Sequence, residues 1–135
     1  MRIGIDFDNT LAIYDAVFLD AAHLRDLIPT NWVGSKKQLR DKLRELPNGE
    51  EEWQKLQGLV YGKLQESARL MEGAAWFLYQ CRSLGIDVFV VSHKTKYAKY
   101  DQNKMPLRQV ALKWMEGKGF FDEKQFALAR EKVFF

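Results

Sequence analysis

Two carboxylates and a hydroxyl alternate near the start of the chain, at Asp6, Asp8 and Thr10. They follow the short apolar run Ile3-Gly4-Ile5, which is typical of a β-strand. Residues two apart in a strand face the same side, so the three polar groups are predicted to leave the strand as one cluster. Such groups could bind a metal ion and attack phosphorus. In open α/β sheets, ligands bind beyond the carboxyl ends of parallel strands, which is where this cluster would lie.

A second predicted strand also ends in a hydroxyl residue. Residues 86–91 have the β-branched and aromatic composition of a strand buried on both faces, and Ser92 follows directly. Asp8-Asn9-Thr10 alone would fit a helix N-terminus, because these residue types cap helices, but two strand ends that supply acid and hydroxyl groups favour a site. His93 and Lys94 come next and are candidates for the substrate pocket, with Lys94 meeting a phosphate or carboxylate. An exposed polar loop is an equally good interpretation of these two residues.

Apolar side chains recur at helical spacing through most of the remaining sequence. The pattern predicts helices over 14–28, 35–46, 50–64, 74–84 and 107–117, a short helix after Asp122, and a last strand over 132–135. Strands that alternate with helices imply right-handed crossovers in a mostly parallel sheet. The first crossover holds more helix than one sheet face requires, so residues from about 12 to 72 are predicted to form a helical cap over the strand ends. Residues 1–11 and 73–135 then form the core of a single domain.

Composition narrows the classes of protein that the chain can represent. Its 135 residues, 47% of them hydrophobic, suffice for one domain, and a net charge of +3 with both signs mixed does not favour nucleic acid as a partner. A single cysteine, Cys81, excludes an internal disulfide and suits a reducing compartment. No apolar run has the length of a membrane span or a signal peptide, so we expect a cytoplasmic protein with no membrane partner.

At this point the residues resemble a known family. The stretch from Ile3 to Leu11 resembles the first motif of the haloacid dehalogenase superfamily, an apolar strand followed by Asp-x-Asp-x-Thr. Val88-Phe89-Val90-Val91-Ser92 is similar to the second motif, and residues 72–85 resemble the helix that usually precedes it. The resemblance implies an α/β fold: a Rossmann-like three-layer sandwich with a mostly parallel sheet and a helical cap inserted after the first strand.

The resemblance also implies a hydrolase that removes phosphate from a small phosphorylated metabolite. Asp6 would be the nucleophile that forms an aspartyl phosphate, and Asp8 the general acid and base. Thr10 and Ser92 would hydrogen-bond the phosphoryl oxygens. The Asp6 carboxylate and the Asp8 carbonyl oxygen would bind Mg²⁺, which prefers oxygen ligands and keeps several waters.

The sequence departs from the family pattern in three places. Asn9 stands where glycine is often found, but asparagine tolerates the left-handed backbone angles that this position needs. The lysine of the third motif has no clear counterpart, and Lys104 and Lys132 are the candidates. The acidic pair of the fourth motif is missing, because Asp122-Glu123 fits a helix start better. The chain therefore resembles the front portion of a longer enzyme, cut before its third and fourth motifs.

Two other functions stay open from the sequence. One is a noncatalytic module that binds phosphate without turnover. The other is a phosphatase that processes nucleic acid through the lysines of residues 94–104, which are interleaved with Tyr97 and Tyr100. The exposed last strand could also pair with a second copy of the chain to form a homodimer.

Overall fold

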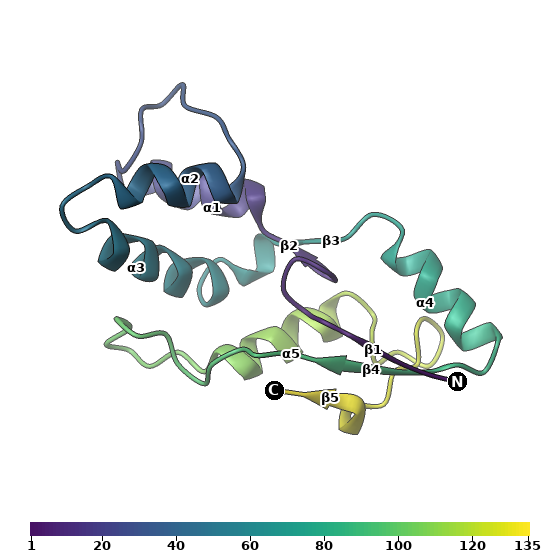
Figure 1. Cartoon of the computed structure of the whole chain (residues 1–135). Coiled ribbons are helices and arrows are strands. Elements are labelled where there is room, and N and C mark those ends of the chain that lie inside the picture. Colours follow the sequence, from purple (N-terminus) through teal and green to yellow (C-terminus); the bar gives the residue numbers. More distant parts are fainter. The chain divides into compact units, whose positions relative to one another are not determined.

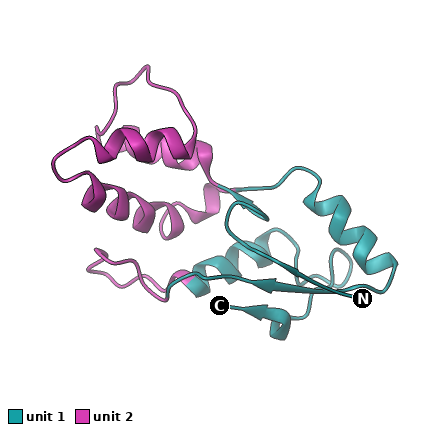
Figure 2. Ribbon diagram, in the orientation of Figure 1, with its two compact units in different colours: residues 1–13, 69–95, 108–135 teal, residues 14–68, 96–107 magenta.

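The computed structural model describes all residues from 1 to 135 as an α/β fold with five α-helices and a three-stranded parallel sheet. Contacts divide the chain into two compact units (Figure 2). Unit 1 comprises residues 1–13, 69–95 and 108–135, and unit 2 comprises residues 14–68 and 96–107. The sequence pattern groups residues 96–107 with the sheet, whereas in the structure they belong to the helical unit.

The sheet of unit 1 is built from β1 (Arg2–Ile5), β4 (Asp87–Val91) and β5 (Val133–Phe134), in the order β1-β4-β5 (Figure 1). Both strand pairs are parallel, as predicted. The prediction that β4 is buried on both faces is wrong. Val88 and Val90 are buried, but Val91 is 47% exposed. Val91 pairs in register with Phe134, which is 50% exposed, so this face of the strand end is only partly covered.

Helix α4 (Ala74–Ser83) packs against β4 and lies between two glycines with left-handed backbone angles. Gly73 has φ of 83° at its start and Gly85 has φ of 65° after its end. At the end, the N–H of Ile86 donates to the Cys81 carbonyl and the N–H of Gly85 to the Arg82 carbonyl, which closes the helix. This confirms the predicted stop at Gly85.

Aromatic contacts connect the helices of unit 1 to the end of β1. Tyr79 of α4 contacts Phe126, which contacts Phe120, and Phe120 contacts Trp114 of α5 (Leu107–Gly117). The Trp114 ring then meets Phe7 edge-on at 5.4 Å between ring centroids. Each such pair contributes about 0.5–1.5 kcal/mol beyond the area that it buries. Phe7 directly follows Asp6, so this series of rings fixes the backbone beside the candidate nucleophile.

Two short segments of unit 1 differ from the sequence prediction. Strands β2 (Ala12–Ile13) and β3 (Arg69–Leu70) form an antiparallel pair that is too short to show as a pattern. The predicted short helix after Asp122 is wrong. Residues 122–127 make a single turn that ends at Ala127, whose φ is 54°. Between this turn and β5 the chain forms one helical segment, the 3₁₀ turn η2 (Arg130–Lys132).

Unit 2 contains α1 (Asp15–Leu24), α2 (Lys36–Arg44), α3 (Gly49–Tyr61) and the 3₁₀ turn η1 (Gln65–Ser67). Phe18 stacks on Trp53 with ring centroids 4.9 Å apart in its core. The predicted start of α2 is confirmed, because the Ser35 hydroxyl accepts from the Gln38 N–H and the Gln38 side chain accepts from the Ser35 N–H.

All three helices of unit 2 end before the predicted residue, and α2 does so at Arg44 rather than at residue 46. Helix α1 ends at Leu24 rather than at residue 28, because Asp26 adopts a φ of 53° and the Leu27 N–H closes on the Ala22 carbonyl. Helix α3 ends at Tyr61, where Gly62 follows, rather than at residue 64. No helix in either unit has the length and apolar character needed to cross a membrane.

Candidate functional site

The loop after β1 carries the two predicted catalytic carboxylates. The strand ends at Ile5, so Asp6 is its first loop residue, and the exposed Asp6 side chain accepts a hydrogen bond from the Phe7 N–H at 2.8 Å. Asn9 has φ of 61°, which confirms that this position needs left-handed backbone angles. The alternating geometry of a strand therefore does not continue to Thr10. The prediction that Asp6, Asp8 and Thr10 face one side because of their strand spacing is wrong, since β1 ends at Ile5.

Backbone hydrogen bonds within the loop fix its shape. The Asn9 N–H donates to the Ala12 carbonyl at 2.8 Å, and the Leu11 and Ala12 N–H groups both donate to the Phe7 carbonyl at 3.0 Å. Phe7, Leu11 and Ala12 are buried, so the apolar side of the loop is anchored while its polar side chains remain partly or fully exposed. These bonds shape the turn that presents Asp6 and Asp8, and the Met71 N–H, which donates to the Leu11 carbonyl at 2.8 Å, holds its end from outside.

The loop after β4 carries the predicted hydroxyl and lysine. Ser92 is buried, and its N–H donates to the Phe134 carbonyl of β5 at 2.9 Å. The Ser92 hydroxyl accepts from the Lys94 N–H at 3.2 Å. The carbonyl of Lys94 in turn accepts from Nε of Arg108, on the first turn of α5, at 3.0 Å.

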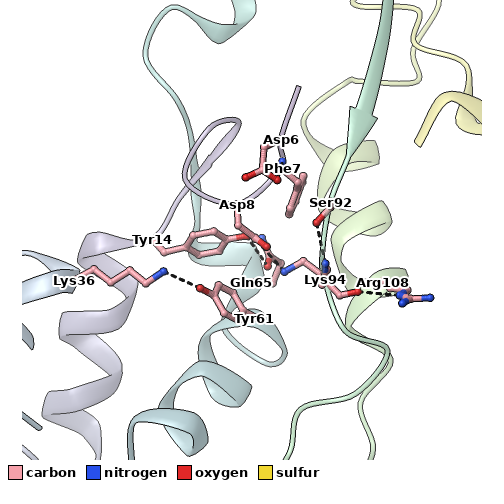
Figure 3. Close-up of polar contacts among 10 residues, drawn as sticks. All are labelled: Asp6, Phe7, Asp8, Tyr14, Lys36, Tyr61, Gln65, Ser92, Lys94 and Arg108. Atoms are coloured by element: carbon pink, nitrogen blue, oxygen red, sulfur yellow. Dashed lines mark hydrogen bonds and ion pairs between the residues drawn. The ribbon is translucent and has the colours of Figure 1, made fainter. Parts of the chain in front are cut away.

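Lys94 connects the two loops through an ion pair with Asp8. Its Nζ lies 3.0 Å from Oδ1 of Asp8, and the side chains are 2% and 23% exposed respectively (Figure 3). The ammonium group also lies 5.4 Å from the centre of the Phe7 ring. Burial lowers the pKa of Lys94 below its ordinary value, and the negative charges of Asp8 and, more weakly, Asp6 oppose that shift. Both carboxylates therefore act on the same buried ammonium group.

The structure brings four of the predicted residues to one end of the sheet. Because β1 and β4 are parallel neighbours, with Ile5 in register with Val90, Asp6 and Ser92 follow the two strands at the same end of the sheet. Asp8 and Lys94 complete the group (Figure 3). Thr10 and His93 are exposed, and no hydrogen bond joins their side chains to the other four residues.

The candidates for the lysine of the third motif lie elsewhere. Lys132 forms an ion pair with Asp87 at 2.7 Å, and the hydrogen bond that it donates lowers the pKa of that carboxyl. Asp87 is the first residue of β4, so this pair lies at the opposite end of the strand from Ser92. Lys104 belongs to unit 2. Within unit 1, Lys94 is the lysine at the carboxyl ends of β1 and β4.

The predicted magnesium ligands offer a small set of oxygen donors. No group of three or more histidine, cysteine, aspartate or glutamate side chains gathers in the structure. The exposed carboxylate of Asp6 uses one oxygen for the Phe7 N–H. An exposed carboxylate fits a hard cation such as Mg²⁺, which takes one or two protein ligands and completes its shell with water and substrate oxygens.

Comparison of the chain with protein-family models, curated protein sequences and solved structures found no match.

Proposed function

We propose that the protein is a Mg²⁺-dependent phosphatase of the haloacid dehalogenase type, acting on a small phosphorylated metabolite. The observation that carries the proposal is the meeting of Asp8 and Lys94 across the carboxyl ends of β1 and β4, beside Asp6 and Ser92. Two carboxylates, a hydroxyl and a buried ammonium group are the side chains that transfer of a phosphoryl group to a carboxylate requires. In this proposal the sheet belongs to a Rossmann-like three-layer sandwich, and unit 2 is the predicted helical cap.

The proposed reaction has two steps. In the first, an Asp6 oxygen bonds to phosphorus while the bond from phosphorus to the leaving oxygen breaks. Asp8, which must be protonated and released from its ion pair with Lys94 before this step, gives its proton to that oxygen. In the second, Asp8 takes a proton from a water molecule, whose oxygen bonds to phosphorus and releases the Asp6 carboxylate and inorganic phosphate. When bound, Mg²⁺ supplies positive charge that offsets the repulsion between the Asp6 carboxylate and the phosphate.

Lys94 and Ser92 hold the phosphoryl group in this scheme. In the free protein the Lys94 ammonium donates to Asp8, and a phosphoryl group offers it further oxygen acceptors. A fixed positive charge that is shielded from water stabilises developing negative charge more strongly than a solvated one. The low exposure of Lys94 therefore supports a role at the reacting group.

The experiment is hydrolysis of p-nitrophenyl phosphate with Mg²⁺ and with a chelator. We expect metal-dependent turnover by the wild-type chain and loss of turnover to the background rate in Asp6→Asn, because the amide is a poor nucleophile. Glu131→Gln is the matched control, since it removes an exposed negative charge on η2, which leads into β5. Full activity of Asp6→Asn would refute the assigned nucleophile. Binding of inorganic phosphate without turnover in the wild type would instead indicate the noncatalytic module.

A further inference from the structure

Hydrogen bonds hold the loop that carries Ser92 and Lys94 at three points, besides the ion pair of Lys94 with Asp8 and the bond from the Leu107 N–H to the Lys96 carbonyl just beyond it. The Ser92 N–H is bound by β5 through the Phe134 carbonyl, and the Ser92 hydroxyl is bound to the Lys94 N–H. The third point is the carbonyl of Lys94, which accepts from Nε of Arg108. The first two contacts fix the start of the loop. The contact with Arg108 holds the Lys94 carbonyl.

Arg108 occupies a position where helix stability does not favour it. It is an exposed residue on the first turn of α5, and positive charge is unfavourable at a helix N-terminus because the backbone dipoles there are positive. No acidic residue in that turn offsets the charge. A residue that breaks a local preference in this way points to a role outside its own helix.

Lys94 lies between Arg108 and Asp8. Its carbonyl meets the guanidinium group of Arg108, while its ammonium group meets the Asp8 carboxylate (Figure 3). Its N–H is bound to the Ser92 hydroxyl. A shift of the Lys94 backbone would therefore move the ammonium group and the serine hydroxyl together.

We propose that Arg108 is a positioning residue of the phosphatase site. Its guanidinium group holds the Lys94 carbonyl and so sets the places of the Lys94 ammonium and the Ser92 hydroxyl for the reacting phosphoryl group. This inference rests on the proposed function. Arg108 itself contacts neither carboxylate, so it acts through the loop and not on the substrate.

The test compares Arg108→Met with Arg108→Lys. Methionine keeps an apolar stem and removes the donor, whereas lysine keeps a charged donor. We expect Arg108→Met to lower kcat for p-nitrophenyl phosphate by between about tenfold and about a hundredfold, because small displacements of reacting groups have effects of that size. Arg108→Lys should recover part of this loss. A rise of KM in Arg108→Met at unchanged kcat would overturn the proposal, because it would show simple attraction of an anionic substrate.

Arg130→Met is the matched control. Arg130 is an exposed arginine of unit 1 that pairs with Glu116, near the other end of α5, at 2.7 Å. Arg130→Met removes the same charge as Arg108→Met and should leave kcat and KM unchanged. The thermal midpoint of Arg108→Met should stay close to that of the wild type, because removing a cation from the first turn of α5 offsets the lost hydrogen bond to the Lys94 carbonyl. A fall in kcat that merely follows a lowered thermal midpoint would contradict the proposal.

Backbone amide NMR separates this inference from the proposed function. In Arg108→Met we expect changed shifts and faster hydrogen exchange of the Lys94 N–H, confined to residues 92–95, whether or not the protein turns over substrate. Unchanged Lys94 signals would overturn the role of Arg108. If the wild type lacks hydrolysis of the ester while these signals respond, the phosphatase proposal fails and the structural effect of Arg108 is still established.

Discussion

The two loops at the candidate site obtain their shapes from different sources. The loop after β1 is closed by hydrogen bonds among residues 7–12, close together in the sequence. The loop after β4 depends on Phe134 of β5 and Arg108 of α5, which lie well beyond it in the chain. The backbone hydrogen bonds that close the first loop can therefore be inferred from a short stretch of sequence, although Phe7 also packs on Trp114 and the Leu11 carbonyl accepts from the Met71 N–H. The second acquires its geometry only when the sheet and α5 are assembled.

The loops also differ in how they expose their charges. Asp6 is exposed and Asp8 is 23% exposed, so the carboxylates of the first loop remain accessible. Lys94 and Ser92 in the second loop are almost fully buried. Charge–charge interactions strengthen as water is excluded, so the second loop supplies the stronger fixed field although it has fewer charged groups. We infer that the first loop provides the reacting groups and the second provides their electrostatic environment.

Among the variants that test the role of the second loop, Lys94→Met is expected to have the largest effect on activity. Removing the buried ammonium group should lower kcat/KM for a phosphate ester by about a hundredfold or more, the effect typical of one lost electrostatic contact in an active site. The free energy of unfolding should be affected less than the activity, because the Asp8 carboxylate keeps some contact with water and methionine fills the space of the lysine stem. Steady-state kinetics and urea unfolding measure the two quantities.

Lys132→Met is the control for that prediction. Lys132 is also a lysine of unit 1 in an ion pair, with Asp87 at the opposite end of β4. Its pair is substantially exposed, so its loss should cost less than about 1 kcal/mol and leave kcat/KM unchanged. Equal losses of kcat/KM in the two variants would show that the burial of Lys94 has no special role.

A smaller effect is expected from Ser92→Ala. The change leaves the Lys94 N–H without its acceptor, and an unsatisfied buried donor costs about 1–3 kcal/mol. Activity should fall by about tenfold if one hydrogen bond to the phosphoryl group is also lost. Ser83→Ala, at the exposed end of α4, serves as the control. Unchanged stability of Ser92→Ala would indicate that the second loop does not need its internal hydrogen bond.

The same distinction explains which parts of the fold could be predicted from sequence. Helices α2 and α4 were located well because Ser35, Gly73 and Gly85 are residue types that signal helix ends. The end of α1 and the turn at residues 122–127 were missed because Asp26 and Ala127 adopt positive φ without being glycine. That conformation costs about 1–2 kcal/mol per residue, and only the assembled structure compensates for it, so no local pattern reveals it.

The site divides in the same way. Asp6, Asp8 and Ser92 were found from their positions after predicted strands, and the parallel pairing of β1 and β4 brings those strand ends together. The pairing of Lys94 with Asp8 was not predicted, because the two residues are 86 positions apart and a lysine in a polar loop is usually solvated. Arg108 gave no signal beyond its unfavourable place on α5. Both contacts belong to the loop whose geometry depends on distant residues.

The smallest predicted effect lies in the first loop and tests whether its shape is set locally. Asn9 has a φ of 61°, so Asn9→Gly should keep stability within about 0.5 kcal/mol, whereas Asn9→Ala should lose about 1 kcal/mol because the β-carbon strains the left-handed conformation. Urea midpoints measure both, and an unchanged slope of the unfolding curve would show that the unfolded state is not altered. Because Lys94 is fixed from the other loop, its amide exchange should stay unchanged in Asn9→Ala. If that exchange accelerates, the two loops are mechanically coupled and the division between a local and an assembled loop is wrong.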